Sequence, residues 1–319
     1  MDIELILAVA MFASAIAALL AGYPVALTLG GIALLFALIG ISLDVFPTAF
    51  LKGFPARIQG SMENQVLIAV PLFVMMGVIL ERSRVAEDLL RIAGRLLGQL
   101  RGGLGFSVVI VGALLAASTG IVGATVITMT LIALPTMLRE GYDPRLASGT
   151  IAASGTLGQI IPPSIVLILL ADAISNANQT ASMQSGMGPS VVSVGDLFAG
   201  ALIPGLLLVG IYLAYIAVTA LLRPAACPPV SATGSPPLKA GEVAFGLGAP
   251  ILLIIAVLGS ILGGVASPTE AAAVGAGGAL LLAGLRLARE TGSRLASLLI
   301  AGLLALGLMI LINAIIDLR

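Results

Sequence analysis

The sequence lacks the residues on which many enzyme and redox sites depend. It contains no histidine and no tryptophan, and its single cysteine is Cys227. Without histidine there is no imidazole metal ligand, no histidine general base and no Ser-His-Asp triad, and one cysteine cannot form an internal disulfide. Charge is also scarce, at 9% of residues with a formal net charge of zero. The composition gives no reason to expect a nucleic-acid partner. An enzyme is not expected either, because an intramembrane enzyme would need paired aspartates or a metal cluster within the spans, and none is visible.

Hydrophobic residues make up 59% of the chain, and the mean hydropathy is +1.18. Soluble domains have about 25% charged residues, so we predict an all-α polytopic membrane protein. Residues 42–64 should form a loop with a short interfacial helix, and the amphipathic segment 85–97 should lie in the interface plane. Full membrane spans are expected at 3–21, 25–41, 65–81, 197–222, 243–264, 268–285 and 295–316.

The segment 104–138 is apolar but interrupted. Its first apolar run, 105–117, would extend only roughly 20 Å as a helix, whereas crossing the bilayer core takes about 20 residues. A cluster of small and hydroxyl residues follows at 118–125, and then a second apolar run. This pattern predicts a re-entrant helical hairpin with its tip at 118–125.

A broken transmembrane helix is expected at 145–171. This segment is long enough to span, yet Ser154-Gly155-Thr156, Gly158-Gln159 and Pro162-Pro163-Ser164 lie in its middle. Proline removes a backbone donor and clashes with the preceding turn, and unwound backbone at membrane depth is tolerated only where it is buried in protein or lines a cavity. Two interrupted segments in succession indicate the binding site of a secondary transporter.

Neutral oxygens would form this site, because no acidic residue lies within 102–138 or 150–170. Sodium prefers oxygen ligands, and the helix N-termini near Gly123 and Ser164 carry partial positive charge that suits a substrate carboxylate. Pro162 and Pro163 are interpreted as the helix break. The predicted substrate and sodium site comprises Ser118, Thr119, Gly120, Gly123, Thr125, Ser154, Gly155, Thr156, Gly158 and Ser164, with sodium assigned to Ser118, Gly120, Gly155 and Thr156.

These residues also have a purely structural interpretation. Ser and Thr in membrane helices often bond to their own backbone carbonyls, and Gly often only packs. Asp143 and Arg145 are interpreted as loop residues, with a gating pair as the alternative. Glu270 is interpreted as a helix cap, with a functional carboxylate in the membrane as the alternative.

The distribution of Lys and Arg predicts the topology. Basic residues in 82–101, in 223–241 and in 286–294 place these segments in the cytoplasm, whereas 172–195 has none and should be an external loop. The N-terminus is then outside. The Pro- and Ser-rich segment 223–241 is expected to be a flexible linker.

Two short stretches indicate an inverted-topology repeat. Tyr23-Pro24 through Gly40 aligns with Ser267-Pro268 through Gly284, and both form a Pro turn between two spans. The charge rule places the two turns on opposite sides of the membrane, as in an inverted repeat. A second hairpin and broken helix would then fall beyond Arg319, so we expect a chain that is truncated, split or missing its second half.

Several motifs in the same order resemble the large membrane subunit of tripartite ATP-independent periplasmic (TRAP) transporters. They are Leu100-Arg101-Gly102-Gly103-Leu104, Gly120 with Gly123-Ala124-Thr125, Leu134-Pro135, Gly141-Tyr142-Asp143-Pro144, Gly158-Gln159-Ile160-Ile161-Pro162-Pro163-Ser164, Asp196-Leu197-Phe198 with Gly200 and Pro204-Gly205, and Ser267-Pro268-Thr269-Glu270-Ala271. The resemblance implies an ion-transporter-like elevator fold that imports a small organic acid or related solute, with sodium as coupling ion and no other cofactor. It also implies a small TRAP membrane subunit and a periplasmic substrate-binding protein as partners, and a location in the bacterial inner membrane with a periplasmic N-terminus.

With this resemblance the chain divides into five parts. These are scaffold helices with an interfacial arm helix (1–101), transport elements (102–172), an external loop with the following span (173–222), a cytoplasmic linker (223–242) and the scaffold helices of a second repeat (243–319). A truncated, scaffold-only or inactive half-transporter is the alternative. A passive channel fits less well, because the polarity is concentrated at two breaks instead of forming a continuous stripe.

Overall fold

The structure is a computed structural model that describes residues 3–120, 122–185, 192–230 and 240–291. Within these ranges the regular structure is helical and contains no strand. Seven described helices are long and apolar enough to cross a membrane. The chain is therefore an all-α polytopic membrane protein, as its composition predicts, and the expected span 295–316 lies outside the described residues. The chain separates into two compact units, 1–64 and 65–319.

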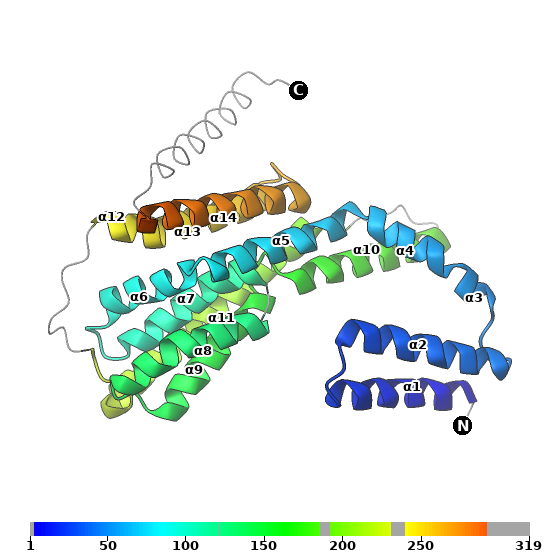
Figure 1. The fold of residues 1–319 in the computed structure, drawn as a ribbon, viewed down its shortest axis with the longest axis horizontal. Helices are drawn as coiled ribbons and strands as arrows, with labels where there is room; N and C mark the ends of the chain where they lie inside the picture. Colours follow the sequence, from blue (N-terminus) through cyan, green and yellow to red (C-terminus); the bar gives the residue numbers. More distant parts are fainter. Residues whose placement is uncertain (1–2, 121, 186–191, 231–239, 292–319) are drawn as a thin grey trace, which may run out of the picture. The chain divides into compact units, whose positions relative to one another are not determined.

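The first unit contains a helical hairpin. Helices α1 (Ile3–Leu20) and α2 (Val25–Ser42) lie side by side (Figure 1). Gly22 makes the turn between them with a φ of +88°, a conformation that costs glycine little because it has no Cβ, and Pro24 precedes the first turn of α2. Two short helices, α3 (Ala49–Lys52) and α4 (Phe54–Glu63), follow where we expected a loop with one short interfacial helix.

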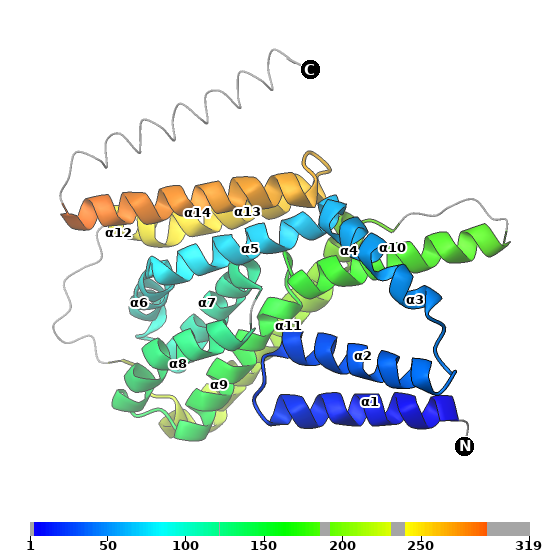
Figure 2. The same cartoon turned by 45° about the vertical axis from the view of Figure 1, so that its right-hand side comes forward.

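In the second unit, α5 (Gln65–Arg82) packs along α14 (Pro268–Thr291), and α13 (Ala249–Leu262) lies beside α14 (Figure 2). Glycines permit this close approach, since a Cβ added to Gly275 would lie 2.6 Å from Met76 Sδ. Small residues at such interfaces allow helix backbones to approach in lipid. Helix α13 continues the helical path of α12 (Ala240–Val243) and the short π-helical segment η3 (Ala244–Gly248).

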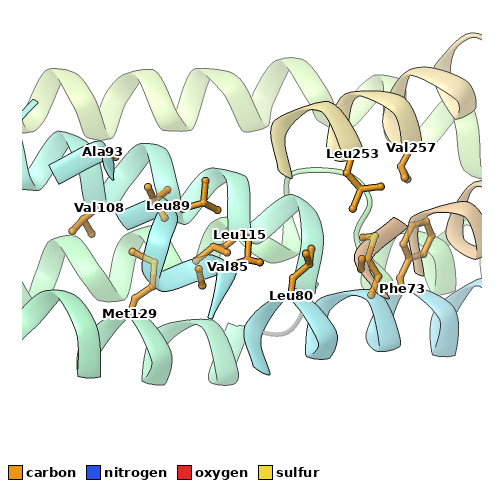
Figure 3. Packing of buried hydrophobic residues seen from close by; sticks show 14 of the residues in the cluster. Phe73, Leu80, Val85, Leu89, Ala93, Val108, Leu115, Met129, Leu253 and Val257 are labelled. Atoms are coloured by element: carbon orange, nitrogen blue, oxygen red, sulfur yellow. The ribbon is translucent and has the colours of Figure 1, made fainter. Parts of the chain in front are cut away.

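The amphipathic helix α6 (Val85–Leu97) has the bounds that the sequence predicts. Its apolar face is buried against α7 (Gly103–Thr119), and Leu89 of α6 and Val108 of α7 both belong to the packed core (Figure 3). On its other side Asp88 pairs with Arg286 of α14 at 2.6 Å. The arm helix is therefore fixed to both neighbours by packing and by charge.

Two segments differ from expectation. Helix α10 (Ile165–Ser185) continues well beyond residue 172, where we expected an external loop to begin; neither Gly nor Pro interrupts it before Ser185, so nothing in the sequence ends the helix earlier. The start of the expected flexible linker is packed: Cys227 is fully buried and its carbonyl accepts a hydrogen bond from the backbone N–H of Gly102 at 2.9 Å. This part of the chain follows α11 (Val194–Leu222) and the short η2 (Pro224–Ala226).

Candidate functional site

A helical hairpin lies at the predicted place and has a narrow tip, and that it is re-entrant stays a prediction. Helix α7 ends at Thr119, and α8 (Val122–Arg139) begins at Val122. Gly120 makes the turn with a φ of +59°, a left-handed conformation that favours glycine. We expected a tip that extended to residue 125, but Gly123 and Thr125 already lie in the first turns of α8. The left-handed conformation of Gly120 starts the reversal of the chain, and the tip is shorter than the polar loop that we expected.

The predicted break in the next helix is also present. Helix α9 (Pro144–Thr156) leads into the short 3₁₀ helix η1 (Leu157–Gln159), and helical structure resumes only at Ile165 of α10. Pro162 and Pro163 lie in the non-helical stretch, as the sequence predicts. Ser164 joins its two sides: its hydroxyl donates to the backbone oxygen of Gln159 at 2.8 Å and accepts from the backbone N–H of Leu167 at 3.4 Å.

The hairpin tip and the helix break contact each other. The side-chain Nε2 of Gln159 donates a hydrogen bond to the backbone oxygen of Gly120 at 2.7 Å, although the two residues are 39 positions apart. A Cβ added to Gly120 would lie 3.2 Å from Ile165 Cγ1, so the start of α10 also packs on the tip. The two interrupted segments that the sequence singles out therefore meet in space.

Glycines bring the helices around this contact close together. A Cβ added to Gly112 of α7 would lie 2.6 Å from Ser154 Cβ, and one added to Gly155 of α9 would lie 2.2 Å from Val126 Cγ2. Gly155 thus has a packing role at the interface between α8 and α9, in addition to the role of sodium ligand that we predicted for its backbone carbonyl. Gly158, in η1, is buried.

The predicted site residues differ in their hydrogen bonds and in their burial. Ser154 donates to the backbone oxygen of Thr150 at 2.6 Å, and Thr156 donates to that of Ala153 at 2.7 Å, so both follow the structural interpretation, with their oxygens still able to accept or to coordinate. Ser154, Ser164 and Thr125 are buried, whereas Thr156 and Gly123 are exposed. The side chains of Ser118 and Thr119 lie outside the described part of the structure.

Gln159 is the site residue that our sequence reasoning missed. We noted it only as part of the break, yet its side chain makes the contact with the tip. Its Oε1 is buried and has no hydrogen-bond partner among the described residues. One signal could have identified it, since Gln159 is the only Asn or Gln between Gly102 and Ala171.

The chemistry of this site suits a monovalent cation bound by neutral oxygens. Between residues 146 and 171, and between 102 and 138, the sequence has no charged side chain. The described residues contain no cluster of three or more Cys, Asp or Glu side chains that could hold a metal ion. Backbone carbonyls at the tip and break are hard ligands of the kind that sodium prefers. The donor set fits sodium and does not fit a tightly held transition metal.

The turn between α8 and α9 anchors the base of the hairpin. The Tyr142 hydroxyl accepts a hydrogen bond from the backbone N–H of Leu104 at 3.2 Å, which satisfies a donor at the start of α7. Burial raises the pKa of Tyr142 to about 12, against the smaller lowering effect of the N–H groups of Gly105 and Leu104. Asp143 caps α9 by accepting from the N–H of Arg145 at 2.7 Å, which supports its interpretation as a structural loop residue.

A small cavity of about 240 Å³ lies where α5 and α6 meet α8, the second helix (return arm) of the hairpin. At its edge Thr128 of α8 donates a hydrogen bond to Glu81 Oε1 of α5 at 2.6 Å. The cavity is lined by Glu81, Arg82, Arg84, Ala86, Glu87, Thr128 and Ile132. No feature of the sequence indicated this contact, which joins the hairpin to a helix that we placed in the scaffold.

Glu270 acts as a helix cap. Its carboxylate accepts from the backbone N–H of Ser267 at 2.8 Å, and the Ser267 hydroxyl accepts in return from the N–H of Glu270 at 3.3 Å. These reciprocal bonds form a capping box at the start of α14, which is the interpretation that we preferred from sequence.

The described helices thus combine a polytopic membrane fold with a hairpin tip that meets a break in a neighbouring helix. Residues 12–316 match the family model described as "Tripartite ATP-independent periplasmic transporter, DctM component". The chain belongs to this family, as the sequence motifs indicated.

Several curated relatives support this assignment. The chain is 33% identical to a C4-dicarboxylate TRAP transporter large permease protein of Rhodobacter capsulatus, over 84% of this chain and 58% of the relative. It is 31% identical to the Vibrio cholerae protein of the same description, over 83% and 53%, and 28% identical to an ectoine TRAP transporter large permease protein of Halomonas elongata, over 82% and 56%. The chain thus spans about half the length of the curated relatives that it matches.

Proposed function

We propose that this chain is the large permease subunit of a sodium-driven TRAP transporter that imports a small organic acid or a related solute. The contact of Gln159 with Gly120 is the observation that carries this proposal, because it brings two helix interruptions to one place. Carbonyl groups released there supply cation ligands, and the N-terminus of α10 offers a positive dipole end to an anionic substrate.

The substrate class follows from the relatives and from the site. Relatives are named for C4-dicarboxylates and for ectoine, and a further relative is named for isethionate. Each is a small solute with an anionic group. An uncharged site with helix N-termini suits such a substrate when a sodium ion supplies the compensating charge.

The proposal includes the partners, the location and the motion. A small membrane subunit would accompany this chain, and a periplasmic binding protein would deliver the solute, in the bacterial inner membrane with the N-terminus of the chain in the periplasm. Helices α7 to α10 would move as the transport element past the helices of the scaffold. The hydrogen bond between Thr128 and Glu81 would then have to break or shift during transport.

Uptake in proteoliposomes tests this function. The 319-residue chain is reconstituted with a small membrane subunit and a binding protein of the same family, and uptake of a radiolabelled C4-dicarboxylate is measured under an inward sodium gradient. We expect uptake that stops when choline replaces sodium. Sodium-independent uptake would exclude sodium coupling. Sodium binding without any uptake would favour the alternative, a half-transporter that is inactive without further sequence.

A further inference from the structure

The side-chain amide of Gln159 lies between the hairpin tip and the helix break. Its Nε2 donates to the backbone oxygen of Gly120 at 2.7 Å, and this bond fixes the orientation of the amide, because the reverse orientation would bring two oxygens together. The other end of the amide, Oε1, is buried and has no partner among the described residues. Buried polar atoms are nearly always paired, so an unpaired one calls for an explanation.

Neither of the two segments at this contact offers a charged partner for this oxygen. An amide oxygen only accepts hydrogen bonds or coordinates cations. The two segments that meet here, 102–138 and 146–171, contain no Lys or Arg. The nearby Ser164 hydroxyl already donates to the backbone oxygen of Gln159. An electropositive group from outside the chain would satisfy the orphaned oxygen.

We infer that Gln159 Oε1 is a ligand of the coupling cation and that the same side chain links cation binding to closure of the hairpin tip. This inference rests on the proposed sodium-coupled function, which by itself assigns no ligand role to Gln159. A cation at Oε1 polarises the amide, and the polarised N–H bonds more strongly to the carbonyl of Gly120. Occupancy of the site therefore tightens the contact between tip and break.

The inference is tested by sodium-dependent thermal stabilisation of the purified chain in nanodiscs, with choline chloride keeping the ionic strength constant. A ligand at concentration c that binds only the folded state stabilises it by RT ln(1 + c/Kd), so the rise of the melting temperature with sodium concentration gives the apparent Kd, which we call the sodium midpoint. We expect Gln159→Leu to raise this sodium concentration about tenfold or more. Gln99→Leu removes an exposed glutamine and should leave this concentration unchanged.

A second variant separates coordination from packing. Gln159→Glu keeps the shape and an oxygen, but a proton then competes with sodium for the carboxylate. The sodium midpoint of Gln159→Glu should therefore rise as the pH falls from about 8 to about 5. The sodium midpoint of the native chain should not show this rise, because an amide does not take up a proton in this range. This variant also carries the test if Gln159→Leu does not fold.

The outcomes distinguish the inference from the proposed function. A sodium-specific shift in the native chain that survives in Gln159→Leu, or a pH-independent midpoint in Gln159→Glu, overturns the role of Gln159 and leaves sodium coupling intact. Equal effects of sodium, potassium and choline on the native chain overturn both.

Discussion

Gly155 of α9 lies directly against Val126 of α8, so closely that a Cβ added to the glycine would be 2.2 Å from Val126 Cγ2. Val126 lies one turn beyond the hairpin tip, and Gly155 lies one turn before the break in the next helix. This close approach holds the two interruptions together, because a larger residue would push the return arm of the hairpin away from α9.

We predict that Gly155→Ala separates the tip from the break. Overpacking typically costs about 1–3 kcal/mol, and sodium-dependent stabilisation should weaken with it. Gly149→Ala in the same helix is the matched control, because an added Cβ there meets nothing within 4 Å, and it should stabilise α9 by about 0.5–1 kcal/mol. Thermal unfolding of both variants with and without sodium measures this. Equal stability of the two alanine variants would contradict the packing role of Gly155.

The bond from Thr128 to Glu81 should contribute measurably to stability. Thr128→Val leaves the Glu81 carboxylate without this donor, and we expect a loss of about 1–3 kcal/mol. Thr130→Val is the control, since the Thr130 hydroxyl donates to Val126 of its own helix. A double-mutant cycle with Glu81→Gln, followed by thermal unfolding, measures the coupling. Additive effects of the two changes would show that the two side chains do not interact.

Tyr142 should make the stability depend on alkaline pH. Its pKa is raised to about 12 by burial, so the unfolded state loses the proton first as the pH rises above about 10. The contribution of Tyr142 is therefore complete below about pH 10 and is lost between about pH 10 and 12. Tyr142→Phe should be less stable at neutral pH, because the Leu104 N–H loses its acceptor, but should lose less stability across this range. Parallel pH profiles of the two proteins would contradict the assignment.

The sequence was sufficient for the features that follow from local chemistry. The amphipathic period gives α6 its bounds, the small residues at the tip and the two prolines locate the interruptions, and Ser267 with Glu270 marks the capping box of α14. Each of these signals acts within a few residues, so it can be read without knowledge of the tertiary structure.

The remaining features depend on contacts between distant parts of the chain. The amide of Gln159 reaches Gly120, Thr128 reaches Glu81, and the backbone around Cys227 bonds to Gly102. The composition of residues 224–230 is typical of a flexible linker. Backbone hydrogen bonds to the turns at Gly98, Gly102 and Asp143 nevertheless hold this segment in place. Such pairings are determined by how the helices pack, which neither periodicity nor residue spacing encodes.

The central claim, that the hairpin tip borders a sodium site, is most directly tested by the reactivity of a cysteine placed beside it. Gly123 is exposed, and an added Cβ there meets nothing within 4 Å, while the native Cys227 is fully buried and should react slowly. The rate of maleimide labelling of Gly123→Cys is measured in sodium and in choline, with Gly149→Cys as the control. We predict that sodium slows labelling of Gly123→Cys several-fold and leaves Gly149→Cys unchanged. Equal labelling rates of Gly123→Cys in the two salts would contradict the account.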